Sequence, residues 1–430
     1  MSRISDINNA KPGDTIILEK GLYDGLEITC KGTKEKPIAI VGRDAVFSSG
    51  LIAKCEYTHF IGFEVRGSEG NRQSNQSGSA PRDISPVDGI SVYGEGNKFI
   101  NLIVHDNIGN NIGCWKTALE NEIYGCIIYN AGWDSEDRGH GYNIYTQNEL
   151  ESGIKNIENC FIFNSHRIGI SAYGGVDISS YNISKNTVFN NGMLSKHKTR
   201  INLLAGSKRS VSNMNVTGNT FYQDGGSSMV QFGYTGKNKD ASIEDNYFVN
   251  DNLFLRDWEE VDVIGNTFIH NNPIKYHLME MPDPRKIRMK YNTYFSDGDT
   301  IKMEGMAWLN GKQLLDRKSY HLRRADAKNS VEITPNKYDP SRIHITVRNP
   351  ERLVAVAVDM SQHLEPGTDY EIIDVQNYFG GSVSAGVYKG GSISLPMNLT
   401  EVSEPTGNVS VKPKHTGIEL GTFILKTKQL

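Results

Sequence analysis

Titratable side chains gather in the segment AGWDSEDRGHG, which places three carboxylates, Asp134, Glu136 and Asp137, just ahead of Arg138 and His140. Paired carboxylates can act as general acid and base, or as a nucleophile, on a glycosidic bond. Carboxylate oxygens are also hard ligands that suit Ca²⁺, the one cofactor that this loop could hold. The sequence assigns no metal ligand, and a solvated acidic loop is the alternative.

A second polar group follows at His166 and Arg167, and Arg200 falls near the same position one repeat later. Histidines and arginines beside carboxylates have the composition that β-elimination from a uronate needs. A cation neutralises the uronate carboxylate and acidifies the neighbouring C–H, and a base then removes that proton. On this interpretation His140 or His166 is the base, and Arg167 and Arg200 are the neutralising cations.

Two other readings of the same residues stay open. Asp134 and Asp137 could instead carry a glycoside hydrolase, or the chain could bind a glycan without cleaving it, as a binding or phage-fibre module. Lys198 belongs to a basic margin (GMLSKHKTR) that could attract an anionic polysaccharide, and Arg138 could also contact the substrate.

Short strands must position these groups, and their alternation predicts which side chains point outward. Aligning GISVY, IGCW, GYNIY and GISAY turns mostly aliphatic side chains inward: Ile90, Val92, Cys114, Ile144, Ile170 and Ala172. The outward positions then include Asn143 and a row of four aromatic residues: Tyr93, Trp115, Tyr145 and Tyr173. Rings stack on sugar C–H faces and amides bind hydroxyls, so this row predicts a carbohydrate platform, in which Tyr145 or Tyr173 could also donate a proton. Rings that merely fill space under loops are the alternative.

The strands belong to an internal repeat between residues 55 and 298. Each unit begins with Asn or Gly and continues as a β-rich run, as in NLIVHDN, GCIIYNAG, NCFIFNS and NTFYQDG. Such a repeat predicts stacked coils of short parallel strands. Asn at one turn of successive coils can form an amide ladder, and Cys126 and Cys160 fall at one position of adjacent coils.

This pattern resembles the right-handed parallel β-helix superfamily of pectate lyases, chondroitinase B-like lyases and polygalacturonases, over roughly residues 10–300. The opening AKPGDTIILEKGLYDG is similar to the N-terminal cap of chondroitinase B- and alginate-lyase-like members. The resemblance implies an enzyme that degrades polysaccharides, with lyase action preferred. The Gly139–His140–Gly141 run with its acidic neighbours also resembles polygalacturonases, but the spacing is compressed and a separate upstream Asn-Thr-Asp is missing.

The expected fold is therefore all-β, with four regions. Residues 1–50 cap the β-helix, 51–300 form it, 301–330 are a linker with a short helix, and 331–430 form an antiparallel β-sandwich, indicated by alternating runs such as RIHITV and LVAVAVDM.

Composition narrows the possible partners. The net charge of −4 in 430 residues gives no field for nucleic acid, and no apolar run reaches the roughly 18 residues of a membrane span. Five cysteines without metal spacing predict reduced core thiols. No signal peptide is recognisable in the chain, so the sequence predicts a cytoplasmic or phage-encoded protein, or an extracellular or periplasmic one if a leader was removed. A polysaccharide is the expected partner, and the oligomeric state stays open.

Overall fold

The computed structural model describes residues 4–48, 50–225, 228–270, 275–279, 286–297, 302–304 and 318–427. The chain divides into two compact units: Met1–Leu322 with Thr406–Val411, and Arg323–Pro405 with Lys412–Leu430. Thr406–Val411, which the sequence placed in the sandwich, thus belongs with the first unit. The described residues include no helix long and apolar enough to cross a membrane.

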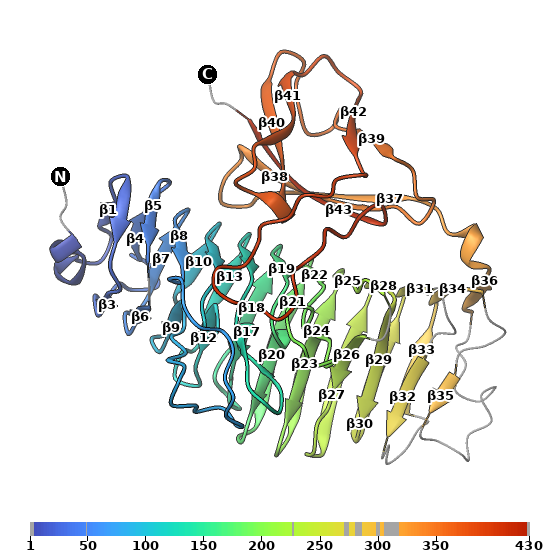
Figure 1. Ribbon diagram of the computed structural model, residues 1–430, viewed down its shortest axis with the longest axis horizontal. Coiled ribbons are helices and arrows are strands. Elements are labelled where there is room, and N and C mark those ends of the chain that lie inside the picture. Colours follow the sequence, from blue (N-terminus) through green and yellow to red (C-terminus); the bar gives the residue numbers. More distant parts are fainter. Residues whose placement is uncertain are drawn as a thin grey trace. The chain divides into compact units, whose positions relative to one another are not determined.

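The first unit is a stack of coils in which each coil contributes one strand to each of three parallel sheets (Figure 1). Parallel strands joined by crossovers are right-handed in nearly all proteins. The unit is the predicted right-handed parallel β-helix. Sheet A contains β1 (Thr15–Ile17), β4 (Ile38–Val41), β7 (Thr58–Ile61), β10 (Lys98–Ile100), β13 (Glu122–Tyr124), β18 (Lys155–Glu158), β21 (Ile178–Ser184), β24 (Val211–Thr217), β27 (Asn238–Glu244), β30 (Trp258–Ile264) and β33 (Ile287–Lys290).

Sheets B and C complete the coils. Sheet B contains β2 (Gly21–Tyr23), β5 (Ala45–Phe47), β8 (Glu64–Arg66), β11 (Ile103–His105), β14 (Ile127–Tyr129), β19 (Phe161–Phe163), β22 (Thr187–Phe189), β25 (Thr220–Tyr222), β28 (Tyr247–Val249), β31 (Thr267–His270), β34 (Thr293–Ser296) and β36 (Tyr320–Leu322). Sheet C contains β3 (Glu27–Ile28), β6 (Leu51–Ala53), β9 (Ile90–Val92), β12 (Ile112–Cys114), β17 (Tyr142–Thr146), β20 (Ile168–Gly174), β23 (Ile201–Ser207), β26 (Ser228–Phe232), β29 (Asp251–Arg256), β32 (Lys275–Met279) and β35 (Lys302–Glu304).

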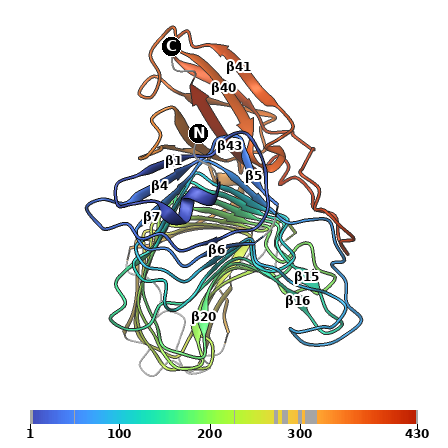
Figure 2. The ribbon, with the colours of Figure 1, turned by 90° about the vertical axis from the view of Figure 1, so that its left-hand side faces the viewer.

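The turns that lead from sheet B to sheet C carry the long insertions. One is the loop 67–88; another holds the hairpin of β15 (Trp133–Asp134) and β16 (Gly139–His140), which projects at one corner of the coil seen end on (Figure 2). The insertions therefore lie beside sheet C, whose outer face they can border.

The N-terminal cap is shorter than the sequence predicted. Strands β1 to β6 already belong to the three sheets, so coiling begins at Thr15. Only the 3₁₀ helix η1 (Ile4–Asn9) precedes them, and it buries Ile7 in the core of the β-helix. The open end of the core is covered by that one turn of chain.

The predicted amide ladder is present, with one shift in register. Asn186, Asn219, Asn246 and Asn266 each donate from Nδ2 to Oδ1 of the next asparagine, over 3.0–3.1 Å, and Asn292 accepts the last of these bonds. The sequence alignment put Asn159 in this column, but Phe161 pairs with Thr187, which places Cys160 there instead. Cys126 N–H donates to Cys160 Sγ, which confirms that the two cysteines stack, and all five cysteines are free and buried.

The second unit is the predicted antiparallel β-sandwich. Its larger sheet contains β37 (Ser330–Pro335), β38 (Arg342–Arg348), β43 (Leu420–Thr427), β40 (Asp369–Asp374) and β41 (Ser382–Val387), and its smaller sheet contains β39 (Ala355–Asp359) and β42 (Ser392–Pro396). Alternate side chains of both sheets share one apolar core. Short 3₁₀ turns, η3 (Arg324–Asp326) and η4 (Val375–Asn377), complete it. Most of the expected linker helix lies outside the described residues.

Candidate functional site

The outer face of sheet C carries the aromatic row that the sequence predicted. Ile90, Val92, Cys114, Ile144, Ile170 and Ala172 all lie in the β-helix core, as expected. Tyr93 is 40% exposed, and Trp115, Tyr145 and Tyr173 are partly exposed. The outward orientation of the four rings is thereby confirmed, while a role in substrate binding stays a prediction.

The rings do not form one straight column. Cys114 pairs with Val92 and with Thr146, and Thr146 pairs with Ala172. Tyr93 and Trp115 therefore share a column with Tyr173, whereas Tyr145 stands two residues nearer the strand start. The sequence alignment of GYNIY with GISAY was wrong by two residues, an even slip that keeps the same faces outward.

Neighbouring rings contact one another along the face. Tyr93 and Trp115 stack with centroids 6.2 Å apart, Trp115 lies 5.5 Å from Tyr145, and Tyr142 stacks on Tyr145 at 5.5 Å. Tyr173 meets Tyr234 edge-on at 5.2 Å. These contacts form two groups of rings, Tyr93–Trp115–Tyr145–Tyr142 and Tyr173–Tyr234, which we together call the aromatic face. Tyr142 and Tyr234 are members that the sequence reasoning missed.

Arginines border the aromatic face on its later coils. Ile168 pairs with Ile201, so Arg167 and Arg200 occupy one column in adjacent coils, as predicted, and both are partly exposed. Arg167 Nη1 donates to Gly139 O over 3.4 Å. Burial and the neighbouring tyrosines raise the pKa of Tyr173, and the charge of Arg167 opposes them. Burial likewise raises the pKa of Tyr145, so both phenols keep their proton at neutral pH.

His140 lies in the hairpin beside these arginines. Its ring stacks on Trp133 at 4.3 Å, and Nε2 lies 3.1 Å from Ser135 Oγ. Burial, helped by the charges of Arg138 and Arg167, lowers the pKa of His140 to about 4. The imidazole is therefore neutral at pH 7. His140 is itself buried apart from 7% of its surface, against 1% for His166 and none for Asp134, so it can accept a proton only through that exposed part.

The tip of the hairpin is solvated. Asp137 accepts hydrogen bonds from Gly78 N–H and Ser135 Oγ and pairs with Arg138. These donors, the Gly78 amide foremost, hold the pKa of Asp137 well below its usual range, so it stays a carboxylate. Lys198 is exposed on the loop before β23. None of these positions tests the substrate contacts predicted for Arg138 and Lys198.

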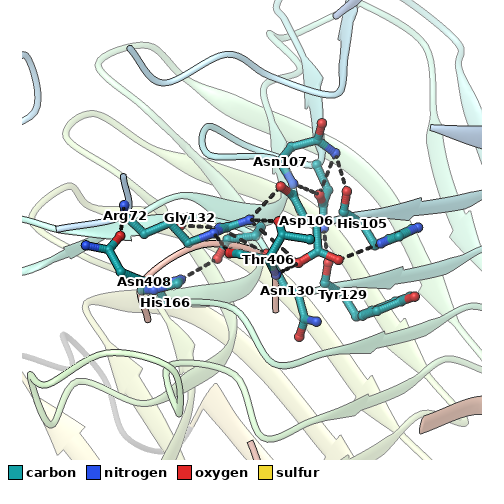
Figure 3. Close-up of polar contacts among 12 residues, drawn as sticks. Arg72, His105, Asp106, Asn107, Tyr129, Asn130, Gly132, His166, Thr406 and Asn408 are labelled. Atoms are coloured by element: carbon teal, nitrogen blue, oxygen red, sulfur yellow. Dashed lines mark hydrogen bonds and ion pairs between the residues drawn. The ribbon is translucent and has the colours of Figure 1, made fainter. Parts of the chain in front are cut away.

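A fully buried arginine, invisible to the sequence reasoning, organises the turns behind the face (Figure 3). Arg72 donates from Nη1 to Gly132 O (2.5 Å), from Nη2 to Asp106 O (2.5 Å) and from Nε to Thr406 O (2.6 Å). Its backbone N–H donates to Asn408 Oδ1. We call Arg72 and these partners the arginine knot. It joins the loop 67–88, two turns and the returning segment Thr406–Val411.

The backbone conformation of two turns places their carbonyl groups toward Arg72. Asp106 and Asn130, the residues that follow two successive sheet B strands, adopt left-handed φ values of 58° and 59°. Asp and Asn tolerate that conformation better than other non-glycine residues. The Asp106 carboxylate also lies 3.6 Å from Arg72 Nη2 and 2.7 Å from His105 Nδ1, and His105 Nε2 reaches Glu64 at 3.1 Å. Burial acts against a charge on His105, but the bonds to Asp106 and Glu64 outweigh it and raise the pKa of His105.

Two predicted catalytic residues, Asp134 and His166, lie buried among the turns around the arginine knot and not on the aromatic face. Asp134 is fully buried and accepts hydrogen bonds from Ser195 Oγ, Lys196 N–H and Ser410 Oγ. His166 is 1% exposed, and its Nδ1–H donates to Ala131 O. Burial and the charge of Arg72 lower the pKa of His166 to about 4. The chemical roles predicted for Asp134 and His166 conflict with this burial, because a substrate cannot reach them.

The outward prediction for Asn143 is wrong. Asn143 is fully buried in a second amide ladder, in which Asn111 donates to Asn143, Asn143 to Asn191, Asn191 to Asn202, and Asn202 to Asp251. Asn143 and Ile144 are both buried, so the alternation of buried and exposed side chains in β17 holds only from Ile144 onward. Asn143 therefore supports the turns and cannot bind substrate.

A carboxylate that the sequence reasoning overlooked lies on the aromatic face. Asp88 Oδ1 accepts the Asn110 N–H at 2.7 Å, and Oδ2 accepts the Ser91 hydroxyl at 3.4 Å. A Cβ added at Gly113 would lie 2.8 Å from Asp88 Oδ2 and 3.4 Å from Trp115 Nε1, so only glycine leaves room for both groups. The sequence feature that could have identified Asp88 is an acidic residue directly before an outward-facing strand. Composition alone does not show whether such a residue belongs to the loop or to the strand.

The predicted acidic loop does not fit Ca²⁺. Asp134 is engaged inside the scaffold and Asp137 at the hairpin tip. Across the residues that the structure describes, no group of three or more His, Cys, Asp or Glu side chains could hold a metal ion. We therefore derive no step that uses calcium.

No protein-family profile and no curated protein matches the chain. Solved structures with a similar course of chain include a pectate lyase (14% identity, covering 71% of this chain and 72% of that one, TM-score 0.40). Another is an alginate lyase from a Paenibacillus species (16% identity, covering 70% of this chain and 93% of that one, TM-score 0.42). A third is a tailspike protein of Acinetobacter baumannii bacteriophage Fri1, a capsular polysaccharide depolymerase (9% identity, covering 96% of this chain and 85% of that one, TM-score 0.29). Likeness at this level concerns the fold only. The strand order and parallel register of this chain give the stacked β-helix, and the crossover rule gives its right hand.

Proposed function

We propose that the chain is a polysaccharide lyase that cleaves a uronate-containing polysaccharide by β-elimination on the aromatic face. One observation carries the proposal: the partly exposed Arg167 stands at the start of β20, the strand that carries Tyr173, in the column of Arg200 and beside a row of partly exposed rings. Rings can hold the sugar faces, a guanidinium can bind a carboxylate in two-point fashion, and a phenol can protonate a leaving oxygen. The lyases and depolymerase named above agree with this proposal in fold.

Each step can be assigned to a residue of the chain. Arg167, assisted by Arg200, neutralises the uronate carboxylate and so acidifies the C5 proton. The neutral imidazole of His140 accepts that proton, and the electron pair forms the C4–C5 double bond. The C4–O bond breaks, and Tyr173 or Tyr145 gives its phenolic proton to the departing oxygen. The tyrosines suit the acid role because their raised pKa keeps them protonated.

The hydrolase alternative fits the residues less well. A glycosidase needs one carboxyl group that carries a proton and one that is ionised. The pKa of Asp137 is depressed, which removes it as the acid, and Asp134 is engaged by three donors inside the scaffold. A lyase that uses Arg167, Tyr173 and His140 requires neither.

A panel of acidic polysaccharides tests the proposal. Cleavage by elimination should give new reducing ends together with the ultraviolet absorbance of an unsaturated product. Arg167→Ala should lower kcat/KM by about 100-fold or more, whereas Arg43→Ala, which removes an exposed arginine at a sheet A–B turn, should not. Reducing ends without unsaturation would indicate a hydrolase, and binding without new ends a glycan-binding module.

The pH profile tests His140 separately. A base must be deprotonated in the free enzyme, so kcat/KM should fall on the acid side near pH 4, the pKa of His140. His140→Ala should lower the rate by about two orders of magnitude and remove that limb. An unchanged acid limb in His140→Ala would assign the base to another residue.

A further inference from the structure

The aromatic face changes its charge along the β-helix axis. The residues two positions before Ile90, Ile112, Ile144 and Ile170 form one column, because these four isoleucines are register partners. That column reads Asp88, Asn110, Tyr142 and Ile168. Arg167 and Arg200 adjoin its later end, about three strand spacings or ~14 Å from Asp88. The early end is thus acidic and the late end basic.

The early end holds a carboxylate without a cation. The contacts of Asp88 come from the Asn110 N–H and the Ser91 hydroxyl, and it makes no ion pair among the described residues. The outward positions of β9, β12 and β17 include Ser91, Tyr93, Gly113, Trp115 and Tyr145, none of them basic. One coil earlier, Lys54 stands in the column of Tyr93, and it pairs with Glu27 at 3.0 Å. Burial of Asp88 raises its pKa, and both contacts are donors, as a carboxylate requires.

The late end holds two arginines. The outward strand positions of β20, β23 and β26 are uncharged: Ile168, Ser171, Tyr173, Ile201, Leu204, Gly206, Met229 and Gln231. Among the described residues, Arg167 and Arg200 stand at the strand starts, and Asp224 lies in the turn before β26, next to Gly225, where an added Cβ would be 3.9 Å from Arg200 Nη1. A Cβ added at Gly206 would lie 2.9 Å from Tyr234 Cβ, so glycine there lets Tyr234 pack against Tyr173 beside these arginines.

From this division we propose that the substrate is a heteropolysaccharide in which uncharged sugars alternate with uronates, with an uncharged sugar bound at Asp88 and Trp115 and a uronate, ~14 Å further along the face, at Tyr173 and Arg167. The inference rests on the proposed function and narrows its substrate class. A carboxylate accepts hydrogen bonds from sugar hydroxyls, whereas a second uronate beside it would be repelled. A homopolyuronate would place a carboxylate at both ends of the face, so Asp88 selects against it.

Paired polymers test the inference. Hyaluronan, chondroitin and heparosan alternate a uronate with an uncharged N-acetylhexosamine, whereas every residue of polygalacturonate and alginate is a uronate. Unsaturated product should form from an alternating polymer at least about tenfold faster than from either homopolyuronate. Equal or faster cleavage of a homopolyuronate overturns the inference and leaves the lyase standing. Absence of unsaturated product from every polymer overturns the lyase, and affinity electrophoresis in the same polymers then decides the inference by the same comparison.

Asp88→Asn isolates the cause. Removal of the charge should raise cleavage or binding of homopolyuronates relative to the alternating polymer by about tenfold at low salt, and the gain should shrink as salt is added. Asp44→Asn is the matched control, because it removes the same charge from an exposed turn between sheets A and B. An unchanged preference in Asp88→Asn would show that Asp88 does not select the sugar.

Discussion

The arginine knot and the aromatic face lie beside the same turns, yet their polar atoms are used differently. In the knot, Arg72 makes bonds to Gly132, Asp106 and Thr406 and is wholly buried. On the face, Arg167 makes one long bond and stays partly exposed. A group whose bonding capacity is used up by the protein can position others, whereas a group with capacity left over can bind a ligand.

The largest effect should come from breaking the knot. Arg72→Ala removes the donor that serves the carbonyls of Thr406, Asn130, Gly132 and Asp106, and it removes the guanidinium beside the Asp106 carboxylate, which keeps its bond to His105. We expect a loss of about 3–5 kcal/mol in the free energy of unfolding, the usual scale for one partner of a buried pair. Urea denaturation measures it, with Arg82→Ala, an exposed arginine of the same loop, as a control that should change little. A loss below about 1 kcal/mol would mean that the knot does not hold the turns.

A buried carboxylate with too few partners sharpens the contrast. Asp251 ends the second amide ladder with a bond from Asn202 to Oδ2, while its Oδ1 is buried without a partner. Burial raises its pKa to about 7, above the usual value near 4, so ionisation of Asp251 lowers stability as the pH rises from about 4 to 7. Asp251→Asn should therefore stabilise the protein at pH 8, by about 2–3 kcal/mol after the cost of one unsatisfied amide. Unfolding at pH 8 and pH 4 measures it, since the gain should vanish at the lower pH.

His166 gives a smaller effect with its own pH window. Its folded pKa of about 4 lies below the unfolded value near 6.5, so its contribution is complete above pH 6.5 and is lost as the pH falls toward 4. Between pH 7.5 and 5 the loss should be about 2 kcal/mol. Two causes lower the pKa of His166. Burial leaves Nε2 without a hydrogen-bond partner, and the positive charge of Arg72 disfavours a second one, although the charges of Asp134 and Asp106 partly oppose it. His166→Gln should remove this part of the pH dependence, and an unchanged slope would place its origin elsewhere.

The sequence predicted the coils, the amide ladder and the outward rings, because each follows from a repeated local pattern. The sequence could not show that Asp134 and His166 are buried while Arg167 is partly exposed. All three lie beside turns, and they differ only in which other segments pack over them. Ser195 and Ser410, which engage Asp134, are 61 and 276 residues away along the chain. Arg72 lies in a Ser- and Asn-rich loop with no pattern that marks it. Asn143 was misplaced because strand alternation does not show that a buried amide ladder takes up its side chain.

The smallest expected effect is on polysaccharide binding, and it tests whether the aromatic face binds a ligand. Trp115→Ala should weaken polysaccharide binding by about 1–2 kcal/mol, because a partly exposed ring loses its contact with sugar but leaves Tyr93 and Tyr145 in place. Affinity electrophoresis measures the change, with Tyr320→Ala, which removes an exposed ring from sheet B, as the matched control. The free energy of unfolding should fall far less than in Arg72→Ala, because the Trp115 ring belongs to no buried core cluster. If Trp115→Ala instead unfolds the protein, and the folded fraction binds polysaccharide as before, then Trp115 stabilises the fold and does not bind sugar. The aromatic face would then have the same structural role as the arginine knot.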